Sequence, residues 1–103
     1  MSLNDKQTEP SKSGWTFLSN HAHVLICIAK DPLSRIRDLA DQINITERAV
    51  QQIIHDLEKA GYLRHVREGR RNRYTVEVKK PLRHPVEKHC NVSELFAVIL
   101  KDT

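Results

Sequence analysis

A set of polar, non-acidic side chains recurs at helical spacing between residues 46 and 60. On a helix that turns by about 100° per residue, one arc carries Arg48, Gln51, Gln52, His55 and Lys59. Such groups form hydrogen bonds with base edges and phosphates. The opposite arc is apolar, as docking on a small core requires, and holds Val50, Ile53, Ile54 and Leu57. The segment predicts a helix with one buried face and one face suited to a nucleic acid.

Positive charge is concentrated in residues 64–73, just after this helix. The segment holds one acid, Glu68, no lysine, and five arginines: Arg64, Arg67, Arg70, Arg71 and Arg73. It therefore accounts for the whole net charge of +4. A guanidinium binds phosphate in a fork, which an ammonium does not. We interpret the segment as a contact for a polyanion.

Two further helices are expected ahead of residues 46–60. Residues 15–30 are apolar nearly all round and predict a first helix, which ends before Pro32. Residues 33–36 are expected to be extended. Residues 37–43 predict a second, short helix with Leu39, Ala40 and Ile43 buried.

The ends of the 46–60 helix are signalled by single residues. Residues 44–45 predict a turn, Thr46 is the expected N-cap, and Gly61 follows where a left-handed C-cap is expected. Two helices joined by a tight turn, the second one longer and polar outside, predict a helix-turn-helix.

A β-hairpin is expected after Gly61. Its arms are residues 62–67 and 73–78, and its loop is residues 68–72. The second arm alternates, which predicts an inward face made of Tyr74, Val76 and Val78.

The C-terminal part predicts a connector and one more helix. Residues 79–89 contain two prolines and no periodicity, and residues 92–100 predict a helix that begins at Asn91 or Ser93. This segment is so apolar that we expect it to be covered by the first helix, in the same chain or in a second copy.

The bulk properties set the class of protein. A chain of 103 residues builds one domain with a modest core, and no apolar run is long enough to span a membrane. Residues 1–14 are polar and lack the apolar region of a signal peptide, so we expect a flexible tail and a cytoplasmic protein. The two cysteines are expected to be free thiols.

Four stretches together resemble a known family: RIRDLA at 35–40, ITERAV at 45–50, LEKAGYL at 57–63 and EGRRNRY at 68–74. They are similar to winged helix-turn-helix transcriptional regulators of MarR-like or ArsR-like type, over residues 15–78. The resemblance implies an α+β, mostly α fold, with a three-helix core, a β-hairpin wing and here a C-terminal helix formed within residues 79–103. It also implies a homodimer that binds a pseudo-palindromic operator in double-stranded DNA. The long dimerisation helices of MarR proteins are absent, so the resemblance locates no dimer interface or effector pocket.

In this interpretation the 46–60 helix lies in the major groove. Arg48 and Gln52 are placed to meet bases, with Gln51 beside them, and Thr46 suits a phosphate. Arg70, Arg71 and Arg73 would follow phosphates or enter the minor groove, with Arg64 and Arg67 behind them. The simpler interpretation of both features is a solvated polar surface.

Other classes of function are weaker. A metal- or redox-responsive sensor of ArsR-like type could use His23, Cys27, His89 and Cys90, but four convergent ligands are needed, and we expect no metal or other cofactor. A winged helix used only as a protein–protein interaction module would have no reason to concentrate arginines at a hairpin tip. An enzyme is not expected, because the chain has no glycine-rich phosphate loop, nucleophile elbow or supported carboxylate pair.

Overall fold

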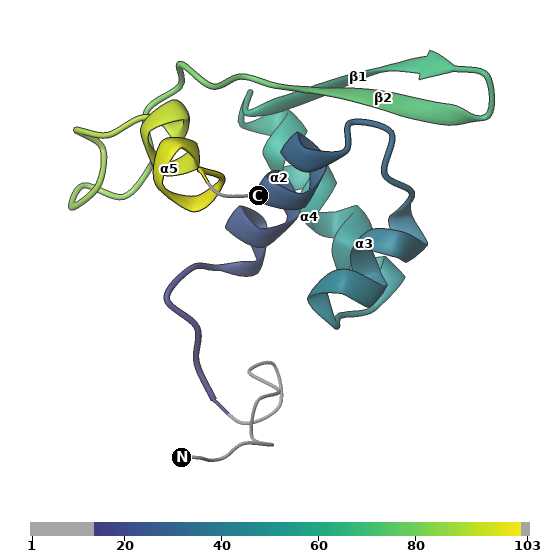
Figure 1. Cartoon of the computed structure of the whole chain (residues 1–103), viewed down its shortest axis with the longest axis horizontal. Helices are drawn as coiled ribbons and strands as arrows, with labels where there is room; N and C mark the ends of the chain where they lie inside the picture. The colour runs from purple at the N-terminus through teal and green to yellow at the C-terminus, as the bar shows by residue number, and fades with distance from the viewer. Residues whose placement is uncertain (1–13, 102–103) are drawn as a thin grey trace.

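A computed structural model describes residues 14–101 and shows three helices, a β-hairpin and a C-terminal helix (Figure 1). The elements are α2 (Asn20–Lys30), α3 (Ile36–Ile43), α4 (Glu47–Lys59), β1 (Leu63–Glu68), β2 (Arg71–Val76) and α5 (Val92–Ile99). This order confirms the predicted winged helix-turn-helix with a C-terminal helix. The expected flexible tail lies outside the described residues except for Gly14.

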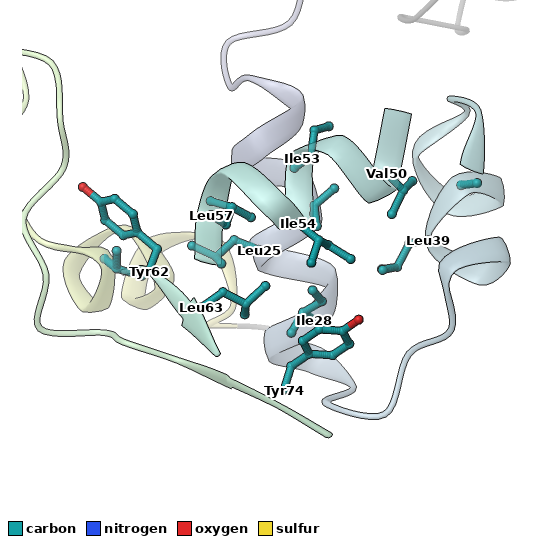
Figure 2. Close-up of a cluster of buried hydrophobic side chains, with 13 residues drawn as sticks. Leu25, Ile28, Leu39, Val50, Ile53, Ile54, Leu57, Tyr62, Leu63 and Tyr74 are labelled. Carbon is teal, nitrogen blue, oxygen red and sulfur yellow. The ribbon is translucent and has the colours of Figure 1, made fainter. Parts of the chain in front are cut away.

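The core forms where the apolar arc of α4 packs between α2 and α3 (Figure 2). Val50, Ile53, Ile54 and Leu57 are all buried, as predicted. They meet residues of α2 and α3 that are also buried, among them Leu25, Ile28 and Leu39. Each such side chain contributes about 1.5–3 kcal/mol through its removal from water. This packing fixes which side of α4 faces outward.

The turn between α3 and α4 is held by local hydrogen bonds. Asn44 adopts a left-handed conformation at φ 65°, and its backbone N–H donates to Ala40 O at 2.8 Å. Thr46 Oγ1 then accepts from the N–H of Ala49 at 3.0 Å, which confirms Thr46 as the N-cap of α4. The helix-turn-helix is thus specified within a few residues.

The other end of α4 is a Schellman motif. Gly61 has φ 86°, its N–H donates to Glu58 O at 3.1 Å, and the N–H of Tyr62 donates to Leu57 O at 2.9 Å. Tyr62 and Leu63 are buried directly afterwards. Gly61 is therefore the predicted C-cap, and it sets the direction in which the hairpin leaves the helix.

The wing is tighter than the sequence indicated. β1 and β2 pair antiparallel from Leu63↔Val76 to Glu68↔Arg71, so only Gly69 and Arg70 form the turn. The predicted loop over residues 68–72 is wrong because Gly69 at φ 62° closes a two-residue turn. Tyr74 is buried as expected. Val78 is 37% exposed, contrary to prediction, because β2 ends at Val76 and the alternation ends with it.

Two segments near the first helix also differ from expectation. The helix begins at Asn20 and not at residue 15, because Ser19 Oγ accepts from the N–H of Ala22 and caps it. Trp15 and Phe17 lie ahead of this cap, 76% and 92% exposed. Before α3, residues 32–33 form a turn, and only Arg35, which precedes the helix, is shown to be extended.

The C-terminal helix packs on its own chain through its first turns. Asn91 and Glu94 form a reciprocal capping box, which confirms Asn91 as the start. Val92 is buried and Phe96 packs against the core, whereas Val98 is 65% exposed. The core of the same chain therefore covers one face of α5, and the expected cover by the first helix stays a prediction.

Replacing Gly61 with Ala is expected to lower the free energy of unfolding by about 1 kcal/mol, because an L side chain is strained at φ 86°. Urea denaturation would measure this. Gly14→Ala is the matched control, since an added Cβ there meets nothing within 4 Å. Equal stability of Gly61→Ala and the parent would contradict the assigned role of the cap.

Candidate nucleic-acid interface

The polar arc of α4 faces solvent along its whole length. Burial of the apolar arc leaves one set of side chains exposed on the opposite side: Arg48, Gln51, Gln52, His55 and Lys59. Thr46 is exposed at the start of the same helix, although its hydroxyl already caps the helix. The predicted residues are therefore brought together on one continuous surface.

Two carboxylates beside this arc are engaged by histidines. Asp56 Oδ2 lies 2.9 Å from Nε2 of His21 on α2, and Asp56 Oδ1 accepts from Nε2 of Gln52 at 3.0 Å. The hydrogen bonds from His21 and then from Gln52 lower the pKa of Asp56. Glu58 is similarly hydrogen-bonded to Nδ1 of His65 on β1. These acids thus link α4 to α2 and to the wing.

The sequence interpretation missed Asp56 and His21. The i, i+4 spacing of Gln52 and Asp56 is a signal that could have indicated their hydrogen bond. No local pattern relates His21 to Asp56, because 35 residues separate them. His21 also lines a cavity of about 550 Å³ between α2, the end of α4 and the connector.

The register of the wing divides its arginines among different positions. Arg64, Arg71 and Arg73 share one face of the hairpin, because Arg64 pairs with Thr75 and alternate residues point to the same side. Arg67 lies on the other face, with Tyr74, and Arg70 is in the turn. The five arginines therefore do not form a single stripe.

Two of these arginines are paired with acids. Arg73 forms an ion pair with Glu68 through Nε and a hydrogen bond from Nη2 at 3.2 Å, and Glu68 has its pKa lowered by this contact. Arg64 Nη1 lies 3.4 Å from Glu77 Oε1. Within residues 14–101, four arginines of the predicted site have no ion-pair partner: Arg48, Arg67, Arg70 and Arg71.

The wing extends past the helical bundle on the side where α3 lies (Figure 1). Its second strand is attached to the segment ahead of α3, since the N–H of Tyr74 donates to Pro32 O at 2.9 Å. Arg71 Nη1 also reaches Leu33 O at 3.4 Å. The second strand is thus held to the segment ahead of α3 at its middle and close to the turn.

The candidate metal and redox residues are not assembled into a site. His23 Nδ1 is hydrogen-bonded to Asn20 at 3.1 Å. In the part of the chain that the structure describes, no group of three or more His, Cys, Asp or Glu residues could hold a metal ion. Burial raises the pKa of the Cys27 thiol, against a smaller opposing effect of Lys30, so the reactive thiolate is disfavoured.

Comparison with known proteins agrees with this geometry. Residues 20–64 match the family model of winged helix-turn-helix DNA-binding domains. This chain contains a winged helix-turn-helix DNA-binding domain. The domain is a binding module and not an enzyme, as the sequence predicted.

Two solved structures share the fold of this domain. ZitR of Lactococcus lactis, described as a zinc-responsive MarR family member, superposes with a TM-score of 0.51 at 20% identity. That match covers 70% of this chain and 51% of ZitR, so the chain spans about half of that protein. The PcaV transcriptional regulator of Streptomyces coelicolor gives a TM-score of 0.54 at 17% identity over 100% of this chain and 86% of PcaV. No curated protein sequence gives a significant match. Among the described residues, no helix is long and apolar enough to cross a membrane.

Replacing Glu68 with Gln should free Arg73 of the DNA-binding domain for phosphate contact. We expect tighter binding to any duplex and a log–log salt slope steeper by up to about 1. Fluorescence anisotropy across a salt titration would measure both quantities. Glu87→Gln makes the same change of charge in the exposed connector and should leave the slope unchanged. Identical slopes for Glu68→Gln and the parent would contradict the role given to Arg73.

Proposed function

We propose that this protein is a sequence-specific transcriptional regulator that binds double-stranded DNA as a homodimer in the cytoplasm. The observation that carries the proposal is the exposed polar arc of α4, which stands opposite the buried core in a DNA-binding domain. The likeness of the fold to PcaV, itself a transcriptional regulator, supports the regulatory role.

In the proposed complex α4 lies in the major groove. Arg48 can bind guanine and Gln52 adenine, each through two hydrogen bonds, and Gln51 lies beside them. Thr46 and the backbone N–H groups at the start of α4 suit a phosphate. His55 and Lys59 continue the same surface toward the end of the helix.

The wing would supply contacts that do not depend on sequence. Arg67, Arg70 and Arg71 have no carboxylate partner among the described residues, so they are available to phosphates or a narrow minor groove. Arg64 and Arg73 would first have to leave Glu77 and Glu68. We therefore assign most of the electrostatic contact to the region around the turn.

A homodimer would allow two copies of α4 to read two half-sites, about one helical turn apart. Exposed apolar side chains offer surface for such an association, since burying them would be favourable. They occur ahead of α2, at Trp15 and Phe17, and on α5, at Val98 and Ile99.

Replacing Arg70 and Arg71 together with Ala should weaken binding to all duplexes similarly and lower the log–log salt slope by up to about 2. A salt titration followed by anisotropy gives the slope. Arg83→Ala with Lys88→Ala is the control, because it removes the same charge from exposed connector residues. An equal loss of duplex affinity and an equal change of salt slope in both double variants would contradict the assignment of the wing as a DNA contact.

Selection of bound sequences from a random duplex pool should yield two inverted half-sites for the parent. Gln52→Ala should change the preference at one base position in each half-site, because an adenine contact is lost. Gln42→Ala, an exposed glutamine on α3, should leave the profile unchanged. A single, asymmetric site would contradict the homodimer, and an unchanged Gln52→Ala profile would remove Gln52 from base recognition.

A further inference from the structure

We propose that Asp56 is a positioning residue that, held by His21, fixes the orientation of the Gln52 amide and thereby sets the base that Gln52 prefers. The inference rests on the proposed function, because it assumes that Gln52 meets a base. It assigns a role in specificity to two residues, neither of which is expected to touch DNA itself.

The contacts form a chain from one helix to the other. His21 on α2 bonds one oxygen of the Asp56 carboxylate at 2.9 Å, and Gln52 donates to the other oxygen at 3.0 Å. Asp56 and Gln52 are one helical turn apart on α4, whereas His21 comes from a different helix. The carboxylate is therefore held from outside α4 and cannot simply follow the Gln52 side chain.

The chemistry of the carboxylate decides which way the amide points. An ionised carboxylate only accepts hydrogen bonds, and the lowered pKa of Asp56 keeps it ionised at neutral pH. Gln52 must then turn its NH₂ group toward Asp56, since the flipped amide would set oxygen against oxygen. The orientation of this amide is thus determined by its partner.

The fixed amide keeps the groups that base recognition needs. One N–H is used by Asp56, which leaves the second N–H and the carbonyl oxygen of Gln52 unused. A donor next to an acceptor complements adenine, which presents N7 as acceptor and N6 as donor in the major groove. Preorganisation also reduces the side-chain entropy lost on binding.

The neighbouring glutamine provides an internal comparison. Gln51 is exposed on the same arc, but its side-chain amide has no hydrogen-bond partner among residues 14–101. Its amide is free to turn over and can suit different bases. Two adjacent residues of the same type therefore differ in whether their orientation is set before DNA arrives.

The test combines base preference with a double-mutant cycle. Gln52→Ala should reduce the preference for its base by about fivefold or more. The preference is the ratio of the affinities for duplexes with the preferred base and with another base at that position. Asp56→Ala should reduce this ratio too. The double variant should show the same ratio as Gln52→Ala alone, because both changes act through one amide. Loss of an acid raises affinity for every duplex alike, so only the ratio reports positioning.

Two more variants separate positioning from folding. His21→Ala, at a half-exposed site bordering the cavity, should reduce the preference less than Asp56→Ala. Asp56→Asn keeps the shape of the side chain but can turn either its oxygen or its NH₂ group toward Gln52. It should therefore also reduce the preference, though by less than Asp56→Ala. A melting temperature for each variant identifies any loss that comes from unfolding.

A measurement without DNA keeps this inference distinguishable from the proposed function. In NMR spectra of the free protein, Asp56→Ala should move the side-chain amide signals of Gln52 and leave those of Gln51 in place. Unmoved Gln52 signals overturn the positioning role, whatever the protein binds. If Gln52→Ala changes the base preference of the parent but Asp56→Ala does not, only the positioning role is overturned. A parent that binds no duplex overturns the proposed function and the role in specificity together.

Discussion

The burial of one face of α4 is the constraint on which the rest of the molecule depends. Val50, Ile53, Ile54 and Leu57 hold the helix against α2 and α3, at about 1.5–3 kcal/mol each. A helix fixed on one side can present only the opposite side, so the polar arc is a consequence of the core. The Schellman motif at Gly61 then carries the same constraint into the wing, since it ties the direction of β1 to the end of α4.

Ion pairs decide which charged side chains on this surface remain unpaired, and the net charge of the chain does not reveal this. Two of the five wing arginines are paired with Glu68 and Glu77, so the arginines that have no carboxylate partner within residues 14–101 concentrate near the turn of the hairpin. The acids beside the polar arc of α4 do more than repel other negative charges. Asp56 is hydrogen-bonded to His21, and Glu58 is hydrogen-bonded to His65. The surface is thus a set of paired and unpaired charges whose placement matters more than their sum.

The sequence predicted what is encoded locally. The 3.6-residue period of α4, the Thr46 cap and the left-handed Gly61 each depend on neighbours within one turn, and the structure confirms all three. Three predictions were wrong because a local feature overrides the broader apolar pattern. Ser19 caps α2 later than predicted, and Gly69 makes the hairpin turn shorter than predicted. The end of β2 at Val76 leaves Val78 outside the alternating strand. The contact of His21 with Asp56 joins two distant helices and depends on tertiary packing, so no sequence pattern indicated it. The DNA-contact roles and the domain limits stay predictions.

We propose that the polar arc of α4 and the turn of the wing bind the same duplex. The most direct test is to add a duplex of about 20 base pairs, two helical turns, to isotope-labelled protein and follow the backbone amide signals by NMR. We expect the largest changes in the signals of residues 46–59 and 67–71, and little change in those of α5. Changes centred on α5 and the connector, with α4 unchanged, would contradict this proposal.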